Sequence, residues 1–447
     1  MRNLDSSIFV QNLGPLQSVS MDLSADFSVI IGPQASGKST LGKIIYFCRK
    51  IRDYAIDIIG QDEAFLSTSS EILYTSFIVK LRKIFAETFE HTEYTSAGFQ
   101  VQYNYDKNDF VLITLGTEGE VNFQFSGDLE NKLKNIFEAI VSFNRDQQQK
   151  DGNNWNNEIF QKFWQHQLAI QRKLQWFGSM FHDDIDTLYI PAGRGILSIL
   201  ANQILPAAAI ANFDTPVRDF IERVQIAKTK FKKGLYKIAE DYANNDKNST
   251  NDINLALSLV KTVLKADYIN EADGEKLYID PVHSMNLIYG SSGQQESLWI
   301  LLFMFSLILE QKRAFIILEE PEANVYPSAQ KDIVKLAALT LNSTKSQIFI
   351  TTHSPYILTS ANVLIQSGRV ESNISGISED VVVPPTLRIN PESTTAYKFS
   401  EDGLNIKLYS IRDVETGMFE ASEIDTISDV IAEETNRLID LEVKHGL

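Results

Sequence analysis

The sequence has little cysteine and no long hydrophobic run. A single cysteine, Cys48, stands among 447 residues, so no disulfide can form within the chain. One thiol fits a reducing compartment, and its place in a predicted helix indicates a small buried side chain. No apolar run approaches the roughly 20 residues of a membrane span, and the N-terminal residues 1–6 lack the pattern of a signal peptide. We therefore expect a cytoplasmic protein with no membrane contact.

Positive charge is also scarce. The 41 Lys and Arg residues face 58 Asp and Glu residues, which gives a formal net charge of −17. Such a balance argues against nonspecific nucleic-acid binding by the whole surface, although a local basic patch stays open. The hydrophobic share of 44% is ordinary for a globular protein. The length allows two or three domains.

A phosphate-loop motif lies close to the start of the chain. Residues 32–40, GPQASGKST, match the pattern G-x-x-x-x-G-K-[ST] at every fixed position. They follow Phe27–Ile31, which reads as a buried strand, and lead into a predicted helix over residues 38–54. The alternative, turn glycines without a ligand, does not account for this strand–loop–helix order. The motif predicts a site for a nucleoside triphosphate.

The spacing of the motif follows from the chemistry of phosphate binding. Gly32 and Gly37 let the backbone curl so that successive N–H groups point at a phosphate. Lys38 reaches the β- and γ-phosphates, and the Ser39 hydroxyl is placed to ligate Mg²⁺. The residues predicted to bind the nucleotide in this loop are Gly32, Gln34, Ser36, Gly37, Lys38, Ser39 and Thr40.

Patterns along the first half of the chain predict mixed α/β structure. Residues 7–12 and 18–23 predict a hairpin, and residues 71–89 predict a helix. The runs 99–105, Phe110–Leu115 and Val121–Phe125, with polar turns between them, predict an antiparallel meander. Further along, residues 129–181 predict helix with a polar break, residues 186–191 a strand, and residues 220–242 one long helix with an apolar seam.

A second possible anion site occurs around Ser292 and Gly293. A predicted strand over residues 285–289 turns there into a helix over residues 294–310, and small residues leave N–H groups open at the helix start. Taken alone, this is also the pattern of an ordinary Ser/Gly helix cap.

Acidic residues and a histidine end two further predicted strands. The buried run 314–318 delivers Glu319, Glu320 and Glu322 to its carboxyl end, where like charges repel unless a cation or a function compensates them. One carboxylate can hold Mg²⁺ and the next can deprotonate an attacking water. The following buried run, from residue 347, ends at His353, which places this histidine near a γ-phosphate.

Four segments together resemble the motifs of ABC-class ATPases. GPQASGKST, SSGQQE, FIILEEPEANVYP and TTHSP are similar, in this order, to the Walker A, signature, Walker B with D-loop, and H-loop motifs. The likeness is greatest to the SMC, RecF and overcoming-lysogenisation-defect (OLD) type. It covers the N-terminal strands and residues 278–360, whereas the helical middle matches only in placement. The resemblance implies an α/β fold, an ABC-type P-loop ATPase head with a mixed sheet, an antiparallel β meander and a helical insertion between the Walker A and signature motifs.

The resemblance also implies residue roles, with ATP and Mg²⁺ as cofactors. Glu319 would hold Mg²⁺ together with Ser39; most ABC proteins have Asp at this position, and the OLD branch shares the Glu. Glu320 would be the catalytic base, and His353 would sense the γ-phosphate. The residues expected to contact ATP held by the opposite subunit are Ser292, Gly293 and Gln295. Glu322 and Asn324 would form the D-loop, and Arg194 would be a nucleotide or interface residue; no glutamine loop is identified.

Four domains are expected from this reading. They are a first ATPase lobe (1–127), a helical insertion (128–275), a second ATPase lobe (276–365) and a C-terminal extension (366–447) with an acidic terminal helix. The expected unit is a homo-oligomer, at least an ATP-bridged dimer. Fewer than a hundred residues follow His353, too few for a toprim nuclease domain. The chain thus resembles the ATPase half of two-gene anti-phage systems of the PARIS type, with a toprim nuclease as separate effector and a phage protein as trigger.

Three alternatives accompany this reading. A RecF-like DNA-repair ATPase could use a basic strip on the helix face, formed by Lys228, Lys230, Lys232, Lys233 and Lys237. The segment His182-Asp183-Asp184, with Asp186, could ligate a metal, although adjacent acids before a strand more often cap a turn. The apolar stripe of the terminal helix could dock a partner or pack on the protein itself.

Overall fold

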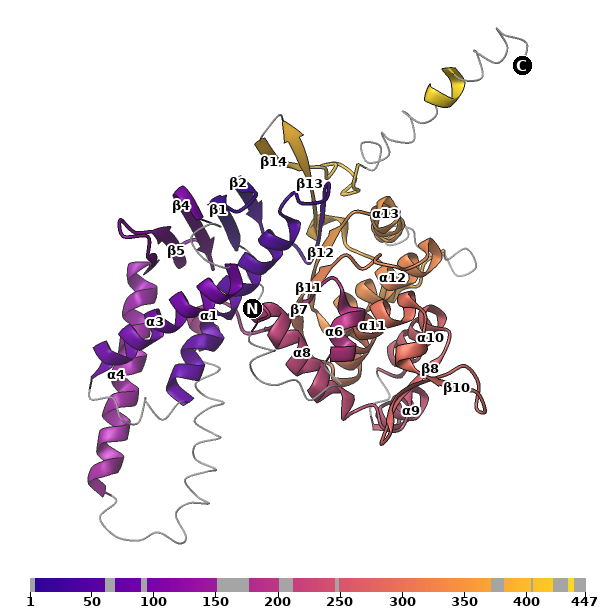
Figure 1. Cartoon of the computed structure of the whole chain (residues 1–447), viewed down its shortest axis with the longest axis horizontal. Helices are drawn as coiled ribbons and strands as arrows, with labels where there is room; N and C mark the ends of the chain where they lie inside the picture. Colours follow the sequence, from indigo (N-terminus) through magenta and orange to yellow (C-terminus); the bar gives the residue numbers. More distant parts are fainter. Residues whose placement is uncertain are drawn as a thin grey trace.

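An eleven-stranded mixed sheet organises the protein, as a computed structural model shows (Figure 1). The structure describes residues 5–60, 69–89, 95–150, 177–200, 212–245, 249–370, 382–402, 405–420 and 433–437. The strand order is β6-β5-β4-β1-β2-β14-β13-β3-β12-β11-β7. The strands of this sheet are β1 (Ser7–Leu13), β2 (Leu16–Asp22), β3 (Phe27–Ile31), β4 (Thr95–Asn104), β5 (Phe110–Leu115), β6 (Val121–Phe125), β7 (Asp186–Ile190), β11 (Ala314–Glu319), β12 (Gln347–Thr352), β13 (Thr394–Asp402) and β14 (Asn405–Ser410).

The sheet has a parallel half and an antiparallel half. β7, β11, β12, β3 and β13 are neighbours and run parallel, while β1, β2, β4, β5 and β6 form antiparallel pairs. The predicted hairpin and meander are thereby confirmed, as is the α/β class. A small second sheet contains β8 (Asp267–Glu271), β9 (Gly274–Tyr278) and β10 (Ser284–Asn286).

Alternating side chains on the parallel strands fill one hydrophobic core on each face of the sheet. On β3, Val29 and Ile31 belong to one core and Ile30 to the other, since successive side chains point to opposite faces. All five residues of β3 and all six of β11 are buried, as expected for parallel strands covered on both faces. The phosphate loop and the acidic strand end therefore project from a rigid, two-sided core.

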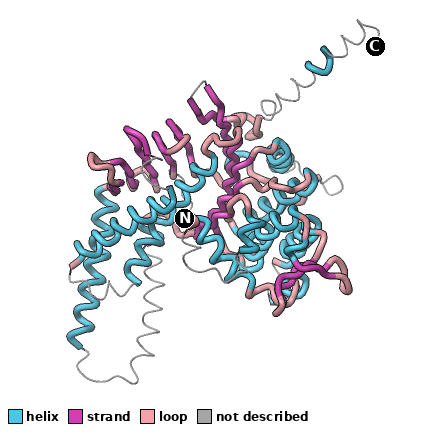
Figure 2. Tube along the Cα trace, viewed as in Figure 1, coloured by secondary structure: helices cyan, strands magenta, loops and turns pink. Residues whose placement is uncertain are grey.

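Helices cover the two faces separately (Figures 1 and 2). One face packs against α1 (Lys38–Gly60), α3 (Ser70–Phe89) and α4 (Gly127–Lys150). The core on the other face includes side chains of α6 (Arg194–Leu200), α8 (Thr215–Lys228), α9 (Leu235–Asn245), α10 (Thr250–Leu264), α11 (Ser292–Glu310), α12 (Pro327–Thr344) and α13 (Pro355–Val370). Short 3₁₀ turns occur at Leu287–Tyr289, Pro385–Leu387 and Pro391–Ser393.

The prediction of one long helix over residues 220–242 is wrong, because a turn divides this segment into α8 and α9. Gly234, directly before α9, has φ +81°, a left-handed conformation that a continuous helix cannot contain. α8 ends at Lys228, and the Thr229 hydroxyl donates to the Ile226 carbonyl. In this turn the Phe231 side chain is buried, and its carbonyl accepts the Asn270 N–H, which joins the turn to β8. Most residues of the predicted apolar seam do lie in the core, but they are distributed over two helices and the turn between them.

Three other expectations differ from the structure or lie outside it. The strand predicted over 285–289 is only partly correct, because β10 ends at Asn286 and a 3₁₀ turn follows. Residues 151–176, part of the helical stretch predicted over residues 129–181, lie outside the described residues. Most of the predicted terminal helix lies outside them as well. The last strands, β13 and β14, belong to the main sheet: β13 pairs in parallel with β3, next to the phosphate loop.

Candidate nucleotide site

The phosphate loop has the backbone that its sequence predicts. Gly37 has φ +96°, and a Cβ there would lie 2.5 Å from Leu16 Cδ2. At Gly32 a Cβ would lie 2.7 Å from the Cβ of Phe399, a residue of β13. Because no side chain fits at either position, only glycine lets the loop curl between β3 and α1. This tight curl is the cradle that a chain of phosphates requires.

Lys38 lies inside this curl. Its Nζ donates to the Gly32 carbonyl at 3.0 Å and to the Pro33 carbonyl at 2.8 Å, and its side chain is buried. Burial lowers the pKa of Lys38, while the nearby carboxylates of Glu320, Glu322 and Glu319 oppose this shift. The ammonium thus faces the acidic strand end across the site. Of the other loop residues, Ser36 is buried, Thr40 is partly exposed, and Gln34 and Ser39 are exposed.

Glu319 occupies the carboxyl end of β11 in a nearly dry position. It is 4% exposed, and its Oε2 accepts the Ala192 N–H at 3.2 Å. Within the described residues its Oε1 has no hydrogen-bond partner. The Tyr189 hydroxyl lies near this carboxylate without closing a hydrogen bond; burial and that charge raise the pKa of Tyr189. A buried carboxylate oxygen with an open lone pair fits the hard oxygen ligands that Mg²⁺ prefers.

Glu320 and His353 face each other from neighbouring strands. Glu320 Oε1 lies 3.2 Å from His353 Nε2, and both side chains are about one third exposed. Glu320 has φ +40°, an unusual conformation for a residue with a side chain, and its N–H donates to the Thr351 carbonyl at 2.8 Å. The third acid, Glu322, accepts the His353 N–H through its Oε1 at 2.6 Å. The acidic loop and the end of β12 therefore form one hydrogen-bonded unit.

The signature segment forms a capped helix start. Ser291 and Gln294 make a reciprocal capping box at the first turn of α11. The alternative interpretation of this segment, an ordinary Ser/Gly helix cap, predicts the same arrangement. Ser292 is exposed, and a Cβ on Gly293 would lie 2.7 Å from the Asn324 carbonyl, so the signature touches the D-loop. Gln295 donates its amide to the carbonyls of Ile288 and Gly290, which shapes its own loop. Its contact with a nucleotide stays a prediction.

Arg194 is not at the surface. Its side chain is 0% exposed, and its guanidinium bonds backbone carbonyls rather than solvent. A direct contact with nucleotide or with another subunit, as the resemblance implied, does not agree with this burial. No signal in the sequence reveals that Arg194 is buried, because burial of a charged residue depends on the packing of distant segments.

Family comparison supplies the classification. The sequence matches the AAA ATPase domain family over residues 6–180 and 131–358. The chain belongs to this family. No match was found among curated proteins.

Solved structures similar to this AAA ATPase domain protein include SMC heads. The SMC head bound to the C-terminal winged-helix domain of ScpA is 11% identical, with a TM-score of 0.41, and the match covers 92% of this chain and 97% of that one. The SMC head domain from Thermotoga maritima is 9% identical, with a TM-score of 0.40 and coverage of 92% and 100%. In the part of this AAA ATPase domain protein that the structure describes, every helix is too short or too polar to cross a membrane.

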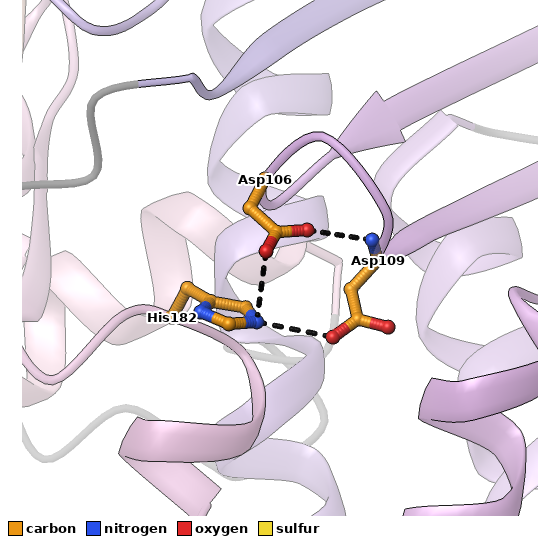
Figure 3. A group of neighbouring side chains, drawn as sticks. All are labelled: Asp106, Asp109 and His182. Atoms are coloured by element: carbon orange, nitrogen blue, oxygen red, sulfur yellow. Dashed lines mark hydrogen bonds and ion pairs between the residues drawn. The ribbon is translucent and has the colours of Figure 1, made fainter.

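The acidic segment proposed as a metal site is divided among three partners. Asp183 pairs with Arg49 at 2.8 Å, and Asp186 pairs with Arg223 at 2.6 Å. Asp184 lies 3.9 Å from Arg313. Only His182 joins other candidate ligands: its Nε2 lies 3.0 Å from Asp109 Oδ2 and 3.2 Å from Asp106 Oδ2 (Figure 3).

Asp106, Asp109 and His182 form a group, here called the His182 cluster, whose negative charge is already paired with a lysine. Lys132 Nζ lies 2.8 Å from the same Asp109 oxygen, and the Ser126 hydroxyl donates to the other at 3.0 Å. Burial alone would raise the pKa of Asp109, but the hydrogen bonds from Lys132, His182 and Ser126 outweigh it and lower that pKa. The cluster therefore serves to link the β4–β5 turn, α4 and the loop before β7.

The basic strip is largely paired with carboxylates. Lys228 lies 3.0 Å from Glu275, and Lys230 contacts Glu310. Lys233 lies 3.1 Å from Asp241, and Lys237 lies 2.6 Å from Glu240. With these partners the lysines form an internally neutralised surface rather than a row of open phosphate contacts. The strip thus gives the DNA-repair alternative no support.

Proposed function

We propose that this AAA ATPase domain protein is an ABC-class enzyme that hydrolyses ATP to ADP and phosphate. One observation carries the proposal: Lys38, Glu319, Glu320 and His353 converge at the carboxyl ends of the adjacent strands β3, β11 and β12. Ligands of open parallel sheets bind at this end of the strands. The four residues come from three motifs, Walker A, Walker B and the H-loop, whose chain order matches the ABC class.

Each residue has a role that its environment supports. Lys38 would neutralise the β- and γ-phosphates, and Ser39 with the open oxygen of Glu319 would hold Mg²⁺. The metal–nucleotide complex supplies the transferable phosphoryl group and neutralises its charge. Glu320, partly exposed, would accept a proton from the attacking water, and His353 at 3.2 Å fixes the orientation of that carboxylate.

The working unit would be a dimer in which each ATP lies between two chains. Ser292 and Gly293 begin α11 at the surface, where they can offer N–H groups to a phosphate held by a second copy. Tyr289 and Tyr326, each 77% exposed, flank the signature and the D-loop in the sequence. Exposed aromatic side chains of this kind favour an interface.

The cellular role that fits best is that of a sensor and scaffold in anti-phage defence. In this proposal the nucleotide state restrains or releases a separate effector, a toprim nuclease, and a phage protein is the trigger. Its support is the resemblance to the PARIS type and the chemistry at hand. Among the described residues, the Asp106–Asp109–His182 cluster is the one group with metal-ligand spacing, and Lys132 already neutralises it. Cutting nucleic acid therefore falls to a partner.

Nucleotide binding and turnover of the purified chain test the core of the proposal. Wild type should bind ATP with Mg²⁺ and release phosphate, whereas Lys38→Ala should weaken binding itself. Lys132→Ala is a control, since Lys132 bonds Asp109, a member of the cluster that Figure 3 shows, and is not part of the phosphate loop. Equal binding by wild type and Lys38→Ala would contradict the assignment of the site.

A further inference from the structure

The buried guanidinium of Arg194 joins three parts of the candidate site. Its Nε donates to the Glu296 carbonyl in α11 at 2.9 Å, and its Nη1 donates to the Pro191 carbonyl at 2.7 Å. Nη1 also reaches the Glu319 carbonyl at 2.5 Å, and Nη2 reaches the Glu320 carbonyl at 3.0 Å. One side chain thus contacts the end of β7, the end of β11 and the first turns of the signature helix.

We propose that Arg194 is a positioning residue for ATP hydrolysis, which holds the Glu319–Glu320 peptide against the signature helix α11 and thereby orients the base. The inference rests on the proposed function, because it assigns how Glu320 is placed rather than what Glu320 does. Arg194 itself touches no reacting atom, since it is wholly buried beneath the acidic loop.

The backbone of Glu320 needs such a support. Its φ of +40° is costly for a residue with a side chain, and such conformations persist only where surrounding contacts hold them. The Thr351 carbonyl holds the Glu320 N–H, and Arg194 holds the Glu320 carbonyl, so the peptide groups on both sides of the Glu320 Cα are fixed. With both fixed, the carboxylate is directed towards His353.

The residue type matters as much as the charge. A guanidinium offers five N–H donors in a planar fork, so it can satisfy several carbonyls that lie in different directions. A lysine ammonium offers its donors from a single nitrogen and cannot span the same acceptors. The buried charge is balanced by Glu296, whose Oε2 lies 3.8 Å from Arg194 Nε. Burial lowers the pKa of Arg194, and this carboxylate opposes the shift most strongly.

The contact also joins the two halves of the proposed site. Glu296 is four residues beyond Ser292 on the same helix, so its carbonyl moves with the signature. A Cβ on Gly195, in the first turn of α6, would lie 3.1 Å from Glu296 Oε1, which shows how closely the start of α6 approaches α11. A shift of the start of α11 would therefore move the Arg194 side chain and, through it, the Glu320 carbonyl.

Arg49 provides a matched control at the other end of the same strands. It is also a buried arginine, paired with Asp183 at 2.8 Å and stacked 3.9 Å above the Phe315 ring. Its Nε donates to Thr187 at the start of β7. Arg49→Lys thus removes a comparable buried fork from β7 and β11 without touching their carboxyl ends.

Steady-state ATP hydrolysis and equilibrium ATP binding, measured on the full chain, test the proposal. Arg194→Lys should lower kcat at least about tenfold, with ATP affinity within about threefold of wild type, since misplacement by about 1 Å impairs chemistry more than binding. Arg49→Lys should lower the melting temperature while kcat of the folded fraction stays within about twofold of wild type. In a Glu320→Gln background, Arg194→Lys should cause almost no further loss, because both changes act through one carboxylate.

Three results would overturn the proposal. They are a normal kcat for folded Arg194→Lys, an equal loss of kcat in both lysine variants, and a full additional loss in the Glu320→Gln background. If Arg194→Lys does not fold, Gly195→Ala disturbs the same junction, and unchanged turnover in that variant overturns the proposal. A wild type that binds but does not hydrolyse ATP would instead refute the proposed function.

Discussion

The imidazole of His353 lies 3.2 Å from the carboxylate of Glu320, although the two residues follow different strands, β12 and β11. β11 and β12 are parallel neighbours in register, with Glu319 opposite Thr351, so residues just past both ends meet above the same edge. The Glu322 side chain completes the link by accepting the His353 N–H. This small network makes the acidic loop a defined unit whose parts can be tested separately.

Glu320→Gln should separate binding from turnover. The amide keeps the shape of the side chain but cannot accept the proton of an attacking water, so hydrolysis should fall at least about a hundredfold. ATP binding should remain, because Lys38 and the phosphate loop are unchanged. The measurements are phosphate release and equilibrium binding of ATP. Glu222→Gln, an exposed carboxylate on α8, is the control, and equal hydrolysis in wild type and Glu320→Gln would remove Glu320 from the mechanism.

Gly37→Ala should abolish nucleotide binding through two separable effects. The left-handed φ costs about 1 kcal/mol for any residue with a Cβ, and at Gly37 that Cβ also meets Leu16 at 2.5 Å. Gly119 has a similar φ of +84° with nothing within 4 Å of its Cβ. Gly119→Ala should therefore show only the small loss of stability, measured by urea unfolding. A similar loss of stability in Gly37→Ala and Gly119→Ala would mean that the phosphate loop relaxes around the added methyl group.

Much of this arrangement follows from local sequence. Buried runs predicted β3, β11 and β12, and parallel strands bring their carboxyl ends together, so the acids and His353 could be expected to meet. Strand order beyond neighbouring motifs could not be predicted. β13 and β14 are rich in polar residues rather than continuous apolar runs, and they enter the sheet between β2 and β3 from the far end of the chain. The role of Arg194 could not be predicted either, since four carbonyls from three segments define it.

Acid should weaken the cluster that Figure 3 shows. The pKa of Asp109 is lower in the folded protein than its ordinary value near 3.9. The stability that its charge contributes is thus present above that ordinary value and is lost as pH falls through the lower, folded value. Asp109→Asn should cost about 1–3 kcal/mol at neutral pH, and the difference from wild type should shrink below about pH 4. Urea unfolding across this range would show a constant difference if the charge does not matter.

The purified chain should leave plasmid DNA and RNA uncut with ATP and either Mg²⁺ or Mn²⁺. Glu319 and Glu320 are proposed to serve nucleotide chemistry, and the His182 cluster is neutralised by Lys132. Gel electrophoresis after incubation is the measurement, with a known nuclease as positive control. Cleavage by the isolated chain that disappears in Glu320→Gln would make this protein itself the effector.

Mixing two inactive variants should restore activity if each site is shared between two copies. Lys38→Ala disables the phosphate loop, and Ser292→Arg blocks the exposed signature. In a mixed dimer one site combines both defects, whereas the other combines two intact halves. With free exchange, half of the dimers are mixed and each has one working site, so about a quarter of wild-type phosphate release should return.

The control for this mixing experiment is the double variant, Lys38→Ala with Ser292→Arg in one chain, mixed with itself. Every site of that dimer has both defects, so no activity should return. Light scattering with ATP establishes that the chains associate at the protein concentration used. If associated and exchanging subunits recover nothing, Ser292 does not act on the nucleotide of the opposite chain. Recovery near a quarter would instead place Ser292 across the interface from Lys38, because a site complete within one chain cannot be rescued by another.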